Sequence, residues 1–224
     1  MSAAGGAAGA EVEPAPARGA ALGPLPEGPV SLDEVVVRGS GGVVVLHQGA
    51  ARPIRVTGDR ARVTGALEDG QLSLLIVPAS DPQETLEVHL WSPAWSTLRV
   101  AGATTVSSAE PLEVGDLSVG LSGSARVELA VRGDAVTTSL RGSSEATLSG
   151  AVERHDARAS GASRLAAAGL RTRATALTVV GTSEAAVFAT GALDLRNEGA
   201  GEVIYGGEPE EITRAGQGTI RASD

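Results

Sequence analysis

Two tryptophans are the residues of this chain whose chemistry most directly suggests binding. Trp91 and Trp95 flank the segment SPA in LWSPAWSTL and are the only tryptophans in the sequence. Sugar-binding sites commonly stack a ligand ring on an aromatic face, so this pair is the best candidate for a contact surface. The competing interpretation, which we favour, is that the proline between them turns a corner that packs over the end of the core.

Three Gly-x-Ser sequences resemble the start of a serine hydrolase motif, with Ser144, Ser163 and Ser183 in the serine position. The full motif, Gly-x-Ser-x-Gly, places its serine on a sharp turn between a strand and a helix and needs the second glycine. All three sequences lack that glycine. We therefore interpret them as repeat turns that are rich in small residues.

The histidines give no further indication of catalysis or metal binding. His47, His89 and His155 are far apart in the sequence and show no spacing typical of a metal site. His155 and Asp156 are adjacent, but neighbouring residues of a strand point to opposite faces, so they are poorly placed to act as an acid/base pair. There is no cysteine, which excludes disulfides and thiolate chemistry. We predict no catalytic residue, no cofactor and no metal ligand.

Acidic residues cluster in two predicted turns, at Glu68 and Asp69 and at Glu208, Glu210 and Glu211. Carboxylate oxygens are the ligands that Ca²⁺ prefers. The glycine-rich calcium-binding nonapeptide of β-helical proteins is absent, however. Solvated turns are therefore the interpretation that we favour.

A second set of charged residues would matter if the protein were an enzyme. A β-helical enzyme acting on a polysaccharide needs acids or arginines gathered on one face of adjacent coils. Arg126, Glu128, Glu145 and Glu184 are the residues that could form such a group. A deep groove with convergent carboxylates would support the enzyme, and a flat face with separated charges would argue against it.

The elements that would position these residues are set by a repeat between residues 98 and 222. One glycine recurs at successive spacings of 21, 19, 19, 20, 18 and 17 residues. This spacing is typical of a solenoid whose units stack on their neighbours. We expect each glycine to occupy a bend that excludes a Cβ atom. The repeat glycines are Gly102, Gly123, Gly142, Gly161, Gly181, Gly199 and Gly216.

Around each glycine, apolar residues alternate with Ser, Thr, Arg and Glu, as in Leu98, Val100 and Val106 of the first unit. A period of two indicates strands with one buried face. In the last unit, counting back from Gly216 aligns Ile212 with the apolar column and places Arg214 at an inward position. A two-sheet sandwich has similar alternation. The regular spacing favours an all-β, right-handed parallel β-helix-like solenoid of about six to seven short coils, with polar terminal coils as a cap.

The segments LRVAGATTVSS, LSVGLSGSARVEL, TTSLRGSSEATLSG, LTVVGTSEAAVFATG and NEGAGEVIYGGEPEEITRAGQGTIR resemble the bacterial head GIN domain, a family called putative auto-transporter adhesins. The resemblance covers residues 32–221, and Tyr205, Gly206, Gly207 and Pro209 match the family's characteristic ending. It implies an exported β-helical domain with an adhesive role. The family has no established catalytic residues that could be carried over to this chain.

The part before the repeats divides into two regions. Residues 1–29 are rich in Ala, Gly and Pro and predict a flexible tether, without the basic and apolar segments of a signal peptide. We expect a signal peptide or lipid anchor to precede them in the natural protein. Residues 30–97 show longer, less regular strands and predict a layer that closes the N-terminal end of a single domain spanning 30–224.

Charge and hydropathy exclude several classes of partner. The net charge is −9 with no basic run, which argues against nucleic acid and anionic lipid, and no apolar stretch is long enough for a membrane helix. We therefore predict a non-enzymatic, exported periplasmic or cell-surface module that contacts an envelope glycan or protein through its faces. The alternatives are a polysaccharide-binding or polysaccharide-processing β-helix, and a self-assembling scaffold that associates as a homo-oligomer through coil ends or a flat face.

Overall fold

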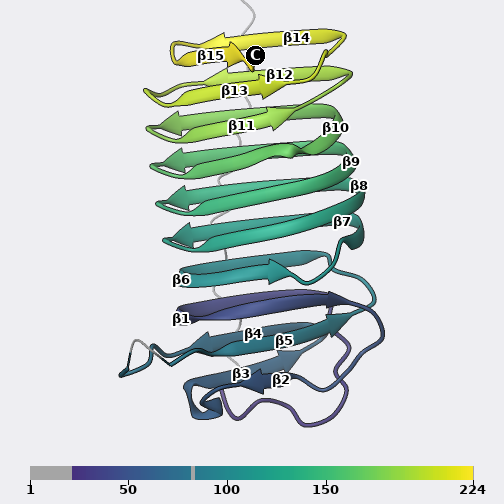
Figure 1. The fold of residues 1–224 in the computed structure, drawn as a ribbon, viewed down its shortest axis with the longest axis vertical. Coiled ribbons are helices and arrows are strands. Elements are labelled where there is room, and N and C mark those ends of the chain that lie inside the picture. The colour runs from purple at the N-terminus through teal and green to yellow at the C-terminus, as the bar shows by residue number, and fades with distance from the viewer. Residues whose placement is uncertain (1–21, 82–83, 224) are drawn as a thin grey trace, which may run out of the picture.

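The computed structural model describes residues 22–81 and 84–223. Within them the strands form one long sheet, and there is one short 3₁₀ helix, η1 (Figure 1). The elements are β1 (Glu34–Gln48), β2 (Arg55–Thr57), η1 (Arg60–Arg62), β3 (Val63–Glu68), β4 (Gln71–Ile76), β5 (Glu87–Ser92), β6 (Thr97–Ser108), β7 (Leu112–Gly123), β8 (Arg126–Gly142), β9 (Glu145–Gly161), β10 (Arg164–Gly181), β11 (Glu184–Phe188), β12 (Ala192–Asn197), β13 (Glu202–Gly206), β14 (Glu211–Gly216) and β15 (Thr219–Ala222).

The predicted β-solenoid is confirmed. Each coil pairs in parallel with the next, and β8, β9 and β10 follow one another in register over most of their length. A long strand bends within each coil, so the coil has two flat sides. We call the side that contains 135–142 of β8 side A and the side that contains 126–132 side B. In Figure 1 the coils lie one above another. Hydrogen-bonded strands of a sheet lie about 4.8 Å apart, which sets the rise from one coil to the next.

The repeat glycines line one edge of this stack, where side A turns into side B of the next coil. Gly102 has a φ of +112°, and a Cβ atom there would lie 2.0 Å from the carbonyl oxygen of Gly39 in the neighbouring coil. The structure thus shows both expected reasons for glycine, a left-handed backbone and a close approach. Gly199 retains the close approach alone, because its Cβ would lie 2.0 Å from the oxygen of Gly181.

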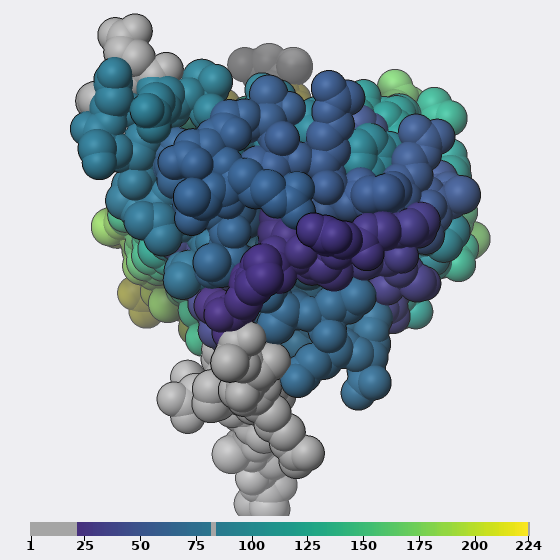
Figure 2. All heavy atoms as spheres, turned by 90° about the horizontal axis from the view of Figure 1, so that it is seen from below, coloured from purple at the N-terminus to yellow at the C-terminus, as the bar shows by residue number. Residues whose placement is uncertain are grey.

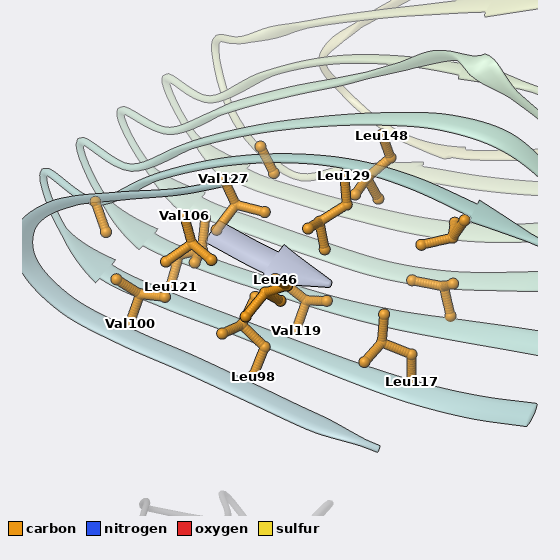
Figure 3. Packing of buried hydrophobic residues seen from close by; sticks show 14 of the residues in the cluster. Leu46, Leu98, Val100, Val106, Leu117, Val119, Leu121, Val127, Leu129 and Leu148 are labelled. Atoms are coloured by element: carbon orange, nitrogen blue, oxygen red, sulfur yellow. The ribbon is translucent and has the colours of Figure 1, made fainter. Parts of the chain in front are cut away.

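The two sides pack their inward residues against each other. The alternation predicted from the sequence holds, as Val106, Val127 and Ala146 form one continuous buried column through β6, β8 and β9. Figure 3 shows leucines and valines of both sides interlocking in the lower part of this interior. The core is therefore filled by small and medium aliphatic side chains, and its width is set by them.

The stack also contains a coil that lies outside the seven glycine-marked units. In β1, Val35 and Val37 lie beside Leu98 and Val100 of β6, and Gly39 lies beside Gly102. The other edge of β1 pairs with β4 and β5. The chain therefore runs through β1, descends to form the end of the stack, and returns past β1 to begin β6.

The N-terminal end is closed by structure that departs from the repeat. β3 pairs with β4 as an antiparallel hairpin, and β2 pairs antiparallel with β5. Residues 22–33 then cross this end, as Figure 2 shows from below. Leu25 is 3% exposed and Gly23 bridges to Gly65, so residues 22–29 pack against the end and the tether prediction is wrong for them. Its other part, 1–21, lies outside the described residues. Composition missed this because one buried leucine among prolines is enough to anchor the segment.

The C-terminal end shows a correction to the predicted alignment. Ile212 lies beside Leu193, and Arg214 lies beside Leu195, which is a shift of two residues from the glycine-based count. The shift arises because Gly216 pairs with Asn197 rather than with Gly199. Asn197 is itself fully buried, so its coil still has a closed interior, and the exposed coil is the last one, β14 with β15.

Candidate binding faces of the solenoid

The charged residues proposed for an enzyme lie on side B, where they form a ladder of ion pairs. Arg126 contacts Glu145 at 2.8 Å, and Arg164 contacts Glu184 at 2.7 Å. In the register, these four residues follow one another in consecutive coils, so cations and anions alternate. Glu128 lies two positions farther along β8. Each of Glu145 and Glu184 is neutralised by an arginine, which is the separated-charge arrangement that argues against a catalytic carboxylate pair.

Side A carries a shallow trough in the upper part of the stack. Two adjoining hollows of about 360 and 280 Å³ share Ala176 and Asp194 in their lining. The outward positions of β10 and β12 hold alanines at 174, 176 and 192, which lower the surface there. Longer polar side chains of β9, β12 and β14 surround these alanines. The rim consists of Arg154, Asp156, Arg158, Asp194, Arg196, Glu198, Glu211 and Thr213.

Charges in the trough are only partly neutralised within the protein. Arg154 contacts Asp156 at 3.1 Å, and Arg196 contacts Glu198 at 3.6 Å. Arg158 on β9 and Asp194 on β12 have no ion-pair partner among the described residues. They stand on either side of β10, two coil spacings or about 10 Å apart along the stack. The trough therefore offers a guanidinium and a carboxylate to a ligand.

The two tryptophans lie in different environments. Trp95 is 3% exposed and packs in the core at the corner where the chain passes β1 to enter β6, so it is not available as a contact surface. The corner is fixed by Ser92, whose hydroxyl donates to the carbonyl oxygens of Leu32 and Ala94. Trp91 is half-buried on side B, where it stacks on His47 with ring centroids 4.6 Å apart. A contact role for Trp91 stays a prediction.

The three serines of the Gly-x-Ser sequences form part of the fold. Ser144, Ser163 and Ser183 are buried in one column immediately after the glycine bends. The hydroxyl of Ser144 donates to the carbonyl oxygen of Arg141, and the hydroxyls of Ser163 and Ser183 are 3.1 Å apart. These contacts satisfy polar groups at the bends, which accords with the interpretation as repeat turns.

His155 and Asp156 point in opposite directions, as expected for neighbours in a strand. His155 is 1% exposed and its Nε2 lies 3.0 Å from the hydroxyl of Thr138, also in the core. Desolvation by burial lowers the pKa of His155 to about 4, and the nearby charge of Asp156 only partly opposes that shift. At neutral pH His155 is therefore an uncharged core residue.

The two groups of acidic residues lie in turns near opposite ends of the stack. Asp69 and Gly70 form the tight turn of the β3–β4 hairpin, with φ values of +47° and +83°. Glu208, Glu210 and Glu211 precede or begin β14 and are exposed. In residues 22–81 and 84–223, no three His, Asp or Glu side chains are grouped so as to hold a metal ion.

One cluster escaped sequence reasoning altogether. His47 and His89, 42 residues apart, meet on side B with His47 Nε2 3.0 Å from His89 Nδ1. They meet because β1 and β5 pair in parallel, which places Val45 beside His89 and His47 beside Trp91. A weak signal existed in the sequence, since VVVLHQ and LEVHLWS both carry a histidine at an outward position near a strand end. The pairing itself depends on a crossover that the sequence pattern does not reveal.

Comparison with known proteins agrees with this architecture. A family model described as "Putative auto-transporter adhesin, head GIN domain" matches residues 31–209. Among curated proteins none matches the chain. No helix in the described part of the chain is long and apolar enough to cross a membrane.

Three solved bacterial structures share the fold. A putative adhesin from Bacteroides fragilis is 19% identical, with a TM-score of 0.78 over 90% of this chain and 95% of that one. A putative lipid binding protein from Parabacteroides distasonis is 19% identical, with a TM-score of 0.66 over 87% and 93%. A putative adhesin from Parabacteroides merdae is 18% identical, with a TM-score of 0.65 over 87% and 94%. At these identities the likeness establishes the fold alone.

Proposed function

Because this chain belongs to the head GIN domain family of putative auto-transporter adhesins, we propose that it is an exported, non-enzymatic adhesion module that binds an envelope or extracellular glycan through the trough on side A. The proposal rests on two features of the trough. Its floor is lined by alanines, and beside it stand Arg158 and Asp194, which have no ion-pair partner among the described residues. A guanidinium can donate two hydrogen bonds to sugar hydroxyls or to a sugar carboxylate, and a carboxylate can accept two hydrogen bonds from sugar hydroxyls.

The fold suits this role because it presents the trough on a rigid surface. The rim residues come from β9, β12 and β14, and their backbones are held by parallel pairing on both sides except at the last coil. Because no loop has to become ordered when the ligand binds, the entropy cost of binding is small. The free energy of a few weak polar contacts is then not cancelled by that cost. Several copies on a surface would add avidity.

The absence of enzymatic activity is part of the proposal and has its own support. On side B, Glu145 and Glu184 are each paired with an arginine, and Glu128 lies two positions farther along β8. In the trough, Asp156 and Glu198 are likewise paired, whereas Asp194 and Glu211 have no ion pair with an arginine in the described part of the chain. Asp194 and Glu211 both line the smaller hollow, so they are the carboxylates that glycoside hydrolysis would require to flank one bond, and the assay of released sugars tests them.

The test is retention of the protein on a panel of bacterial envelope and extracellular polysaccharides, with assay of released sugars in the same incubations. We expect retention on at least one polysaccharide without release. The double variant Arg158→Gln with Asp194→Asn should lose affinity about tenfold or more, because two charge-assisted hydrogen bonds are removed.

The matched control is Arg99→Gln with Asp116→Asn, which makes the same charge changes on side A. Arg99 lies in the column of Arg158, three coils below it, and Asp116 lies in the column of Arg154. The control should bind like the unchanged protein. Release of sugars would contradict the non-enzymatic proposal, and equal loss in both double variants would contradict the location of the site.

A further inference from the structure

The contact between His47 and His89 brings two imidazole rings together and places a carboxylate near the outer nitrogen of each ring. Each imidazole has one nitrogen facing the other ring and one facing a carboxylate. His47 Nδ1 lies 3.5 Å from Glu110 Oε2, and His89 Nε2 lies 3.5 Å from Glu87 Oε2. The facing nitrogens, His47 Nε2 and His89 Nδ1, are 3.0 Å apart.

The carboxylates determine where the imidazole protons lie. A neutral imidazole carries a single N–H, and a carboxylate can only accept a hydrogen bond. When His47 donates to Glu110 and His89 donates to Glu87, both facing nitrogens present lone pairs to each other. In that tautomer the two facing lone pairs can bind one metal ion beside the nitrogens, whereas without a metal one ring donates a hydrogen bond to the other across the 3.0 Å contact.

We propose that His47 and His89 bind a divalent transition-metal ion, Cu²⁺ or Ni²⁺, through these two nitrogens. Bonds of about 2.0–2.1 Å from both nitrogens to one ion would subtend an angle of roughly 90° at a separation of this size. Such an angle fits adjacent positions of a tetragonal site, the geometry that Cu²⁺ and Ni²⁺ prefer with nitrogen ligands. Water completes the coordination.

The surroundings have the features of a built metal site. A ligating histidine usually donates its other N–H to a carboxylate, which fixes the ring and raises its basicity. The carboxylate of Glu110 is fixed in place, because its Oε1 accepts a hydrogen bond of 2.7 Å from the backbone N–H of Gln48. Trp91 stacks on His47 with an interplanar angle of 11° and so restrains that ring. The side chains of His47 and His89 are 19% and 21% exposed, which leaves the ion accessible.

Two arginines also approach this face. The guanidinium of Arg52 lies over the Trp91 ring, 5.7 Å from its centroid, and Arg55 lies beside His89 in the β2–β5 register. Both arginines are exposed. The site is on side B near the N-terminal end, whereas the trough is on side A near the other end, so this inference does not depend on the proposed function.

The test uses untagged protein titrated with Cu²⁺ alone and, separately, with Ni²⁺ alone. The chain has three histidines and no cysteine, so its imidazole NMR signals are few and no thiol competes for the metal. We expect one equivalent of either ion to broaden the signals of His47 and His89. His155, four coils and about 19 Å along the stack from β1, should be unaffected. The electron paramagnetic resonance spectrum of the Cu²⁺ form should show hyperfine coupling to two nitrogens.

Variants separate the ligands from the groups that position them. His47→Gln and His89→Gln should each lower Cu²⁺ affinity at least about tenfold and leave one coupled nitrogen. Glu110→Gln should lower it about tenfold while two nitrogens stay coupled, since that carboxylate acts through His47. Trp91→Phe is the control and should retain affinity within about threefold, because it keeps an aromatic ring over His47.

Three results would overturn the metal site. Equal Cu²⁺ affinity of the unchanged protein and His89→Gln would show that the pair does not chelate. Broadening of His155 together with the other two would show unspecific binding. A spectrum with a single coupled nitrogen in the unchanged protein would assign the 3.0 Å contact to a proton shared by the rings and would equally reject the metal.

Discussion

The interior of the solenoid changes character between β7 and β8. Below this level the inward columns are almost entirely Leu, Val and Ile, and the end is covered by the β3–β4 hairpin and residues 22–33 (Figure 2). Above it, the column that holds Leu117 continues through Val136 to His155 and Thr175. Polar groups there are buried and hydrogen-bonded, and the stack ends in an exposed coil.

The difference shows two ways to finish a repeat structure. The lower half closes by leaving the repeat pattern, which buries its last apolar row under antiparallel strands. The upper half tapers, since its core residues become smaller and more polar and the final coil has little apolar surface to cover. We therefore expect most of the stability to reside in the lower half.

The largest expected effect compares one aliphatic residue at each end. Leu74 in β4 is 1% exposed, whereas Ile212 in β14 is 39% exposed. Leu74→Ala should lower the free energy of unfolding by about 2–5 kcal/mol because it leaves a cavity, and Ile212→Ala should lower it by less than about 1 kcal/mol. Urea denaturation measures both. Equal costs would mean that the last coil is covered in solution and that the two ends do not differ.

The second prediction concerns pH and the polar interior of the upper half. The folded-state pKa of His155 is lowered to about 4 by burial, whereas the unfolded chain has the ordinary value near 6.5. Between these values the unfolded state binds more protons, so stability is lost as pH falls from 6.5 toward 4. The loss amounts to about 3 kcal/mol over that interval.

The control for this prediction is the double variant His155→Leu with Thr138→Val, which replaces both members of the buried hydrogen bond by apolar residues. Other groups titrate equally in both proteins, so the difference between their urea midpoints from pH 7 to 4.5 isolates His155. Parallel pH profiles would show that His155 is not buried as uncharged imidazole.

The repeat unit was predictable from the sequence because each of its signals is local. A bend glycine and the alternation around it depend on a few neighbouring residues, as at Gly102 with Val100 and Val106. The strand register predicted from the glycines is wrong where the length of the repeat unit changes. Gly216 pairs with Asn197, and this displaced Ile212 and Arg214 by two positions from the expected columns.

The candidate sites were less predictable because they form between coils. The alternation of apolar and polar residues indicates which positions face outward, but not that Ala176 between Arg158 and Asp194 would leave a hollow. His47 and His89 meet only because β1 lies between β5 and β6 in the stack. Conversely, Trp95 looked like a contact residue from its type, and the corner that buries it depends on hydrogen bonds from Ser92 to a distant carbonyl.

The third prediction concerns Asn197, which fastens the last coil to the stack. Its side-chain amide donates to the carbonyl oxygens of Gly201 at 2.8 Å and Thr219 at 3.1 Å. Asn197→Ala should cost about 1–3 kcal/mol, because it leaves buried carbonyls without a donor. Hydrogen exchange should rise in β15 above all. Arg196→Ala, an exposed change in the same strand, is the control and should leave exchange in β15 unaltered.

The smallest expected effect tests whether the ion-pair ladder on side B compensates for the polar interior of the upper half. Arg164 and Glu184 are 2.7 Å apart, but their side chains are 61% and 53% exposed. Water and salt screen such a pair, so a double-mutant cycle with Arg164→Ala and Glu184→Ala should give a coupling of about 0.2–1 kcal/mol that falls in 1 M salt. A coupling above about 2 kcal/mol that persists in salt would mean that surface ion pairs stabilise the upper half. The two halves would then differ in which interactions stabilise them, the core in the lower half and the surface in the upper half, rather than in how stable they are.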